Sequence, residues 1–161
     1  MTSALILKNE SLNKYNSWRV GGTADALYTP KDLEDLKMFL KKENYLKPLT
    51  FIGLGSNILV RDGGIRGTVI VMHAALNNIQ FTENGVYAEA GNTCAKLAKN
   101  LAKEHYVGEE FFAGIPGTIG GALAMNAGCY GSETWNFVTK VNMIDAQGNI
   151  VSRLKEDFKI S

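Results

Sequence analysis

The sequence predicts an α+β fold in two small lobes that meet near residues 72–77. Three observations support this prediction. Segments with strand and helix patterns follow one another irregularly, as strand, helix, strands, hairpin, helix, glycine-rich helix and hairpin. The chain has 161 residues, of which 45% are hydrophobic and 20% charged, which is enough for a real core. Two glycine-rich stretches are expected to line the cleft between the folded lobes, and small molecules often bind at such junctions.

The first lobe is expected to span residues 1–72 and to hold one helix among short strands. The helix pattern covers residues 32–42, with acidic residues in the first turn and lysines in the last, which suits the helix dipole. Gly21 and Gly22 indicate a tight entry into the first strand. The strand patterns lie at residues 24–29, 49–52, 58–60 and 68–72.

The second lobe is expected to span residues 73–161 and to contain two hairpins and two helices. Asn92 and Thr93 are expected to cap the N-terminus of the first of these helices. The hairpins pair residues 78–82 with 86–90 and residues 137–145 with 150–154, and the helices cover residues 94–103 and 119–126.

The first glycine-rich stretch, Gly53-Leu-Gly-Ser-Asn57, follows an apolar strand pattern directly. Its two glycines allow successive N–H groups to turn to one side, which predicts a nest for an anion. It departs from the dinucleotide fingerprint GxGxxG, because the third glycine would fall on Ile58 and a strand is expected next. No GxxxxGK[ST] motif is present either. The alternative is an ordinary glycine-rich connection between strands.

The second stretch runs from Ala113 to Gly131, contains six glycines and carries no charged residue. Thr118 is the expected N-cap of a short helix whose free first-turn N–H groups would attract a phosphate, a carboxylate or an electron-rich ring edge. The alternative is a small-residue helix that packs closely on a sheet. So dense a run of glycines favours a ligand over close packing.

Composition excludes several classes of function. The net charge is +1 and no run of Lys or Arg occurs, which argues against nucleic-acid binding. No apolar stretch reaches membrane-spanning length, and the N-terminal apolar run lacks a signal-peptide pattern, so we expect a cytoplasmic protein. Cys94 and Cys129 lack CxxC spacing and have only His73 and His105 to accompany them, so no metal site is expected.

Three motifs, in this order, resemble the bacterial UDP-N-acetylenolpyruvoylglucosamine reductases: residues 17–24, 53–60 and 113–131. The resemblance covers nearly the whole chain. It implies a two-subdomain FAD-binding fold of the vanillyl-alcohol oxidase and para-cresol methylhydroxylase type, with FAD between subdomains 1–72 and 73–161. Neither His73 nor His105 lies in a glycine loop, which favours non-covalent FAD.

The resemblance also implies which residues bind the cofactor. The loop around the pyrophosphate would be formed by Gly53, Leu54, Gly55, Ser56, Asn57 and Ile58. The segment around the flavin would be formed by Gly114, Ile115, Pro116, Gly117, Thr118, Gly120, Gly121, Asn126, Ala127 and Gly128. The implied reaction is the NADPH-dependent reduction of the enolpyruvyl ether on a UDP-sugar for peptidoglycan synthesis, carried out by a monomer.

The sequence departs from the family pattern at its C-terminal end. It stops at Ser161, where the family continues into the segment with its catalytic arginine, and the substrate domain with its serine and glutamate is missing. We therefore assign no catalytic residue and expect a fold truncated before the substrate domain and inactive alone. The alternatives are another FAD oxidoreductase of this fold, such as a sugar or alcohol oxidase, and a small-molecule-binding module without redox chemistry.

Overall fold

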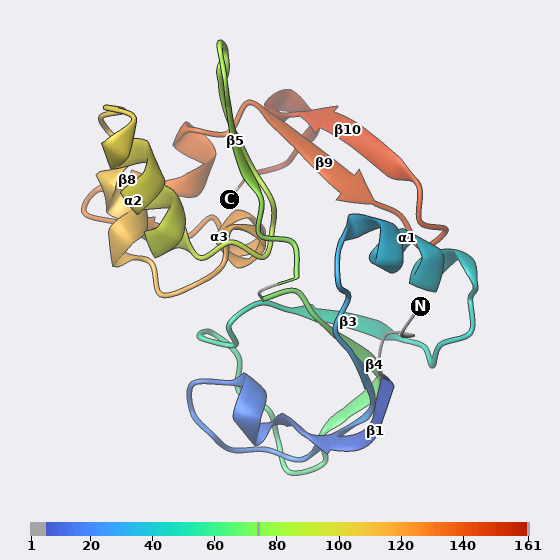
Figure 1. The fold of residues 1–161 in the computed structure, drawn as a ribbon. Helices are drawn as coiled ribbons and strands as arrows, with labels where there is room; N and C mark the ends of the chain where they lie inside the picture. The colour runs from blue at the N-terminus through green and yellow to red at the C-terminus, as the bar shows by residue number, and fades with distance from the viewer. Residues whose placement is uncertain (1–5, 74, 161) are drawn as a thin grey trace.

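A four-stranded sheet organises the first part of the chain in the computed structural model, which describes residues 6–73 and 75–160 (Figure 1). The strand order is β1-β2-β4-β3. β1 (Ile6–Ser11) pairs antiparallel with β2 (Thr23–Tyr28), whereas β4 (Ile65–Val71) lies parallel to both β2 and β3 (Leu49–Ile52). Residues 1–5 of the N-terminal apolar run and position 74 of the predicted junction lie outside the described residues.

The centre of this sheet is buried on both faces, as parallel strands usually are. Residues 67–71 of β4 are all buried, and the apolar side chains of residues 69–71 divide between two clusters. One cluster contains Val69 and Leu12, which belongs to the 3-10 helix η1 (Leu12–Tyr15). The other contains Ile70 and is covered by α1 (Leu33–Lys41).

α1 forms as its sequence predicts. The Asp32 side chain caps the helix by accepting from Asp35 N, and Leu36 and Leu40 face the sheet with 0% and 1% exposure. The Phe39 ring stacks on Tyr28 of β2 at a centroid distance of 3.9 Å. One helix therefore covers one face of the sheet.

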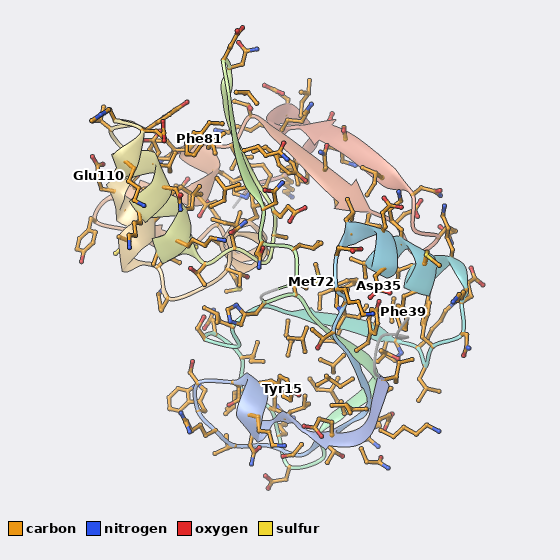
Figure 2. The ribbon with its side chains drawn as sticks, viewed as in Figure 1. Tyr15, Asp35, Phe39, Met72, Phe81 and Glu110 are labelled. Carbon is orange, nitrogen blue, oxygen red and sulfur yellow. The ribbon has the colours of Figure 1, made fainter. Side chains whose placement is uncertain are left out.

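The second group of elements begins after Met72, which lies between it and the sheet (Figure 2). A core cluster under α2 and α3 includes Leu97, Phe112 and Ile119. The helices are α2 (Cys94–Lys103), α3 (Ile119–Met125) and the 3-10 helices η2 (Glu110–Gly114), η3 (Thr134–Asn136) and η4 (Lys155–Asp157). The strands form three separate antiparallel pairs: β5 (Ile79–Thr82) with β6 (Gly85–Ala88), β7 (Gly128–Cys129) with β8 (Ser132–Glu133), and β9 (Lys140–Ile144) with β10 (Ile150–Leu154).

The β9–β10 hairpin rests on α1 rather than on the β5–β6 hairpin (Figure 1). Its turn is held there by Tyr45, whose hydroxyl donates to Ala146 O at 3.3 Å. Ile144 packs against the cluster that contains Leu36 and Leu40. The division at residues 72 and 73 stays a prediction, because this hairpin contacts the first group of elements.

The sequence patterns correctly predict the helices α1, α2 and α3 and both hairpins. The prediction of a strand at residues 58–60 is wrong. These residues form an irregular segment in which Leu59 is 70% exposed and Val60 is buried against the backbone of Gly21. The strand expected from residue 137 begins only at Lys140. No helix among residues 6–73 and 75–160 is long and apolar enough to cross a membrane.

Candidate cofactor site

The structure brings the two glycine-rich stretches into contact. The loop of residues 53–57 follows the carboxyl end of β3, at the sheet edge where the parallel strands β2 and β4 also end. Gly53 lies directly against Thr118, the N-cap of α3, so closely that a Cβ on Gly53 would overlap the Thr118 hydroxyl oxygen. Ligands commonly bind outside the carboxyl ends of parallel strands, which makes this junction a candidate site.

The 53–57 loop continues along α3 toward its C-terminal end. A Cβ on Gly117 would lie 3.7 Å from the Ser56 hydroxyl oxygen, and Asn57 Nδ2 donates to Met125 Sδ at 3.7 Å. Ser56 and Thr118 therefore place two hydroxyl groups near the contact between the loop and the helix.

Most of the backbone N–H groups of this loop have no partner within the described protein. Within residues 6–73 and 75–160, the N–H groups of residues 54–57 donate to no protein acceptor. Gly55 has φ +67°, a left-handed conformation that changes the direction in which successive N–H groups point. Consecutive unpaired amides of this kind form anion-binding nests.

The prediction for the N-terminus of α3 is wrong in part. Thr118 does cap the helix, accepting from Gly121 N at 3.3 Å. However, Ile119 N donates to Asn92 O at 2.8 Å and Gly120 N to Ala90 O at 2.9 Å. The segment after β6 therefore occupies the first-turn N–H groups that the sequence alone left free for a ligand.

Several predicted site glycines are needed for close packing within the protein. A Cβ on Gly55 would strike the carbonyl oxygen of Tyr15, and one on Gly114 would lie 2.6 Å from Cys129 Sγ. A Cβ on Gly120 would lie 3.0 Å from the Ala90 Cβ. At these positions the ordinary packing interpretation accounts for glycine without a ligand.

Residues 126–128 lie at the opposite end of α3 from Thr118. Asn126 ends the helix with φ +45°, and its Oδ1 accepts from Trp135 N at 3.2 Å. Ala127 O accepts from the Thr134 hydroxyl at 2.7 Å. A Cβ on Gly128 would lie 2.7 Å from a backbone oxygen of the neighbouring strand β8. These residues build the turn directly after Met125, the residue of α3 that Asn57 contacts.

The remaining predicted site residues differ in exposure. Ile115 is 7% exposed and belongs to the core cluster under α2 and α3, so its side chain is not available to a ligand. Pro116 and Gly121 are exposed. The partly exposed residues are Leu54 and Ile58.

The first of the three motifs supports the loop, a role that its residues alone do not indicate. Ser17 N donates to Gly55 O at 3.0 Å, and Gly22 N donates to Arg61 O at 3.0 Å. The Gly21–Gly22 pair was the only signal of such close packing in the sequence. Trp18 beside them is 67% exposed. All three motifs thus meet at the 53–57 loop.

The thiol of Cys94 is not activated. Burial raises the pKa of the Cys94 thiol to about 11, so it stays protonated at neutral pH. Cys94 N donates to Gly117 O at 2.9 Å, which places this inert thiol behind the glycine stretch. Among the residues that the structure describes, no group of three or more His, Cys, Asp and Glu side chains could hold a metal ion.

Comparison with known protein families shows the family to which the chain belongs. The profile described as "FAD binding domain" matches residues 24–153, most of the chain. The chain belongs to this family. The match includes the 53–57 loop, α3 and both predicted hairpins.

Among curated proteins, the UDP-N-acetylenolpyruvoylglucosamine reductase of Nitrosospira multiformis is 49% identical over 156 residues, 94% of this chain but 45% of the relative. The crystal structure of the Thermus caldophilus enzyme (MurB) gives a TM-score of 0.75 at 26% identity, covering 98% of this chain and 55% of that one. The chain thus spans about half the length of the reductases that it matches. The family resemblance drawn from the three motifs is confirmed.

The fold class is confirmed as well. The structure is an α+β FAD-binding domain of the para-cresol methylhydroxylase type. Cholesterol oxidase from B. sterolicum matches with a TM-score of 0.67 over 94% of this chain and 33% of its own, at 17% identity. That likeness shows the shared fold alone.

Proposed function

We propose that this chain is the FAD-binding part of a UDP-N-acetylenolpyruvoylglucosamine reductase, with the 53–57 loop and the Gly117–Thr118 turn around the FAD pyrophosphate. The observation that carries the proposal is the set of unpaired N–H groups at residues 54–57, beside a second glycine turn. The family match and the 49% identity to the Nitrosospira multiformis reductase support it.

The residues present fit a pyrophosphate. Amide N–H groups and the Ser56 hydroxyl are neutral donors that stabilise phosphate oxygens without a lysine. This agrees with the net charge of +1 and the lack of a basic run. Gly117 has no side chain to fill the space near Ser56, so a ligand can approach the backbone there.

When bound, FAD supplies hydride transfer from NADPH to the enolpyruvyl ether of UDP-N-acetylglucosamine, the reaction that yields UDP-N-acetylmuramate for peptidoglycan. The residues of this chain bind and orient the cofactor, and we assign none of them a proton-transfer role. No histidine lies in either glycine-rich stretch, in keeping with non-covalent binding.

A hybrid protein tests the proposal. Residues 1–161 replace the matching half of the Nitrosospira multiformis reductase, and the purified hybrid is examined for bound flavin and for NADPH oxidation. We expect a yellow protein that releases FAD on denaturation and reduces the enolpyruvyl substrate. The chain alone should bind FAD more weakly than about 1 μM, because half of the relatives' length is absent.

The same hybrid separates the proposal from its competitors. A colourless, folded hybrid would point to a binding module without redox chemistry. A yellow hybrid that oxidises sugars or alcohols with oxygen, and ignores the enolpyruvyl substrate, would favour an oxidase instead.

A further inference from the structure

Two buried asparagines contact the two glycine-rich stretches, one on each. Asn16 is 6% exposed and Asn92 is 1% exposed. In both side chains Nδ2 donates to two backbone carbonyl oxygens, whereas Oδ1 is buried without a hydrogen-bond partner in the described part of the chain. A buried polar atom without a partner is unfavourable, so an apolar residue would suit these positions better if packing were the only requirement. The two N–H groups of each side-chain amide are therefore the reason for asparagine here.

Asn16 closes the loop that supports the first glycine-rich stretch. Its Nδ2 donates to Leu12 O at 2.7 Å and to Val20 O at 2.9 Å, which joins the two ends of this loop. The next residue, Ser17, donates its N–H to Gly55 O at 3.0 Å. A Cβ on Gly55 would lie 2.7 Å from Asn16 Cα, so the glycine also packs against the asparagine backbone. The hydrogen bonds of Asn16 thus fix the surface on which the first stretch lies.

Asn92 has the same relation to the second glycine-rich stretch. Its Nδ2 donates to Asn78 O at 2.8 Å and to Glu89 O at 3.2 Å, which holds the segment after β6 at the base of the β5–β6 hairpin. The Asn92 carbonyl oxygen accepts from Ile119 N at 2.8 Å, in the first turn of α3. One residue therefore joins the hairpin to the N-terminus of α3.

The segment that Asn92 holds continues along the glycine turn before α3. Thr93 forms an isolated antiparallel bridge with Thr118. Cys94 N donates to Gly117 O at 2.9 Å. The position of the Gly117–Thr118 turn therefore depends on the position of this segment.

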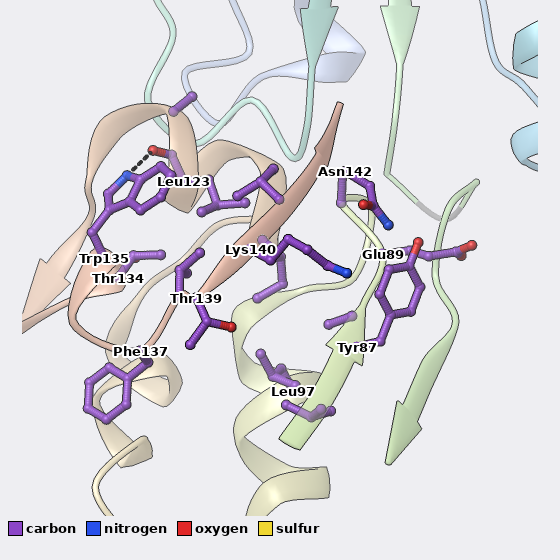
Figure 3. A pocket seen from close by; sticks show the side chains of 18 of the residues that line it. Tyr87, Glu89, Leu97, Leu123, Thr134, Trp135, Phe137, Thr139, Lys140 and Asn142 are labelled. Carbon is purple, nitrogen blue, oxygen red and sulfur yellow. Dashed lines mark hydrogen bonds between the residues drawn. The ribbon is translucent and has the colours of Figure 1, made fainter. Parts of the chain in front are cut away.

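One side of this contact is open. Glu89, Ala90, Ile119 and Gly120 all line a cavity of about 800 Å³ that lies between the β5–β6 and β9–β10 hairpins (Figure 3). Within the described residues, side chains therefore pack against the contact from the other side only. The hydrogen bonds of Asn92 accordingly have a larger share in holding it than they would in a closed core.

We propose that Asn16 and Asn92 are positioning residues that together set the distance between the two glycine-rich stretches, and with it the fit of the FAD pyrophosphate. Both side chains are buried, so they act through the backbone segments that they bind and not through contact with the cofactor. The part of this inference that concerns FAD rests on the proposed function. The part that concerns the hydrogen bonds does not.

Amide hydrogen exchange on the full chain without FAD tests the hydrogen bonds. Asn92→Ala should speed exchange at least tenfold at Ile119 and Gly120, because their acceptors lie on the segment that Asn92 holds. Asn16→Ala should do the same at Ser17. Each rate is compared with the rates of the β4 amides in the same variant, so that a general loss of stability does not count as a local effect.

Flavin fluorescence titrations of the hybrid reductase test the cofactor part. Asn16→Ala and Asn92→Ala should each bind FAD at least tenfold more weakly than the parent hybrid while still folded at the temperature of the titration. Asn16→Ser and Asn92→Ser retain one side-chain donor, so their affinities should lie between those of the alanine variants and the parent. The serine variants also provide the test if an alanine variant does not fold.

Leu36→Ala is the matched control for stability, because Leu36 is fully buried under α1. It should lower the melting temperature as much as the asparagine variants do. It should change neither the affinity of the folded hybrid for FAD nor the exchange at Ile119, Gly120 and Ser17 relative to β4.

Three results would overturn the inference. They are unchanged relative exchange in the asparagine variants, FAD affinities equal to that of the parent, and an equal loss of affinity in Leu36→Ala, which would show that binding follows stability alone. A parent hybrid that binds no FAD would refute the proposed function, and with it the cofactor part of this inference. The exchange measurements would still decide whether the two asparagines hold the stretches in place.

Discussion

Glycines close together at this site serve different purposes. Gly55 has φ +67°, and a Cβ there would strike the Tyr15 carbonyl oxygen, so the fold itself requires glycine. A Cβ on Gly117 would meet only Ile115 and Ser56, both at an ordinary 3.7 Å. The protein without a ligand would therefore tolerate alanine at position 117. A methyl group there would be unfavourable only if a ligand occupied the same space.

We predict opposite outcomes for Gly55→Ala and Gly117→Ala in the hybrid reductase. Gly55→Ala should destabilise the fold by about 2 kcal/mol or more, through left-handed strain and overlap. Gly117→Ala should have the melting temperature of the parent protein but bind FAD at least tenfold more weakly, a loss of about 1.4 kcal/mol in binding free energy. Thermal melts and flavin fluorescence titrations measure the two effects.

Gly63→Ala is the control for these variants, because a Cβ at Gly63 would meet nothing within 4 Å. It should change neither the melting temperature nor the affinity for FAD. Unchanged FAD binding by Gly117→Ala would remove the Gly117–Thr118 turn from the proposed cofactor site.

At the scale of elements, the β9–β10 turn is organised by one carboxylate. Asp145 accepts from Gln147 N at 2.9 Å, from Asn149 N at 2.8 Å and from Asn149 Nδ2 at 3.1 Å. These donors, those of Asn149 first, lower the pKa of Asp145. The turn also carries Ala146, which the Tyr45 hydroxyl holds against α1.

We predict that Asp145→Ala lowers the melting temperature of the chain at pH 7, by roughly 2–4 °C. A carboxylate whose pKa is lowered in the folded state makes its full contribution to the stability of the fold at pH values above its ordinary pKa. That contribution disappears as the pH falls through the lowered value. The difference between variant and parent should therefore narrow from pH 7 toward pH 3 in calorimetric melts. Asp145→Asn, which keeps one acceptor oxygen, should lie in between, and a difference independent of pH would contradict this account.

Periodicity in the sequence was enough to predict the elements with a strong pattern. α1 and α2 have one apolar face and a side-chain cap, and the β5–β6 hairpin turns at Glu83 and Asn84. β1 was missed because Lys8, Asn9 and Glu10 give it a polar sequence, which an edge strand tolerates. The strand predicted at residues 58–60 is wrong because an apolar sequence does not require strand pairing. Val60 packs against Gly21 in an irregular segment.

At the scale of the whole molecule, the meeting of the two glycine-rich stretches could be predicted, but the role of each glycine could not. Small residues in a sequence show that something approaches the backbone closely. They do not show whether it is Tyr15, Ala90 or a cofactor. For the same reason, the assignment of individual residues to FAD stays a prediction, whereas the fold and the family are confirmed.

The last prediction concerns catalysis by the chain alone. Thr118 and Met125 contact the 53–57 loop with their side chains. Neither exchanges a proton near neutral pH, and reduction of the enolpyruvyl carbon needs a proton donor within hydrogen-bond reach. The chain, FAD, NADPH and the enolpyruvyl substrate together should therefore oxidise NADPH no faster than free FAD does, while the hybrid reductase turns over under the same conditions. Substrate-dependent oxidation by the chain alone, after removal of any full-length reductase from the expression host, would place a proton donor within residues 1–161.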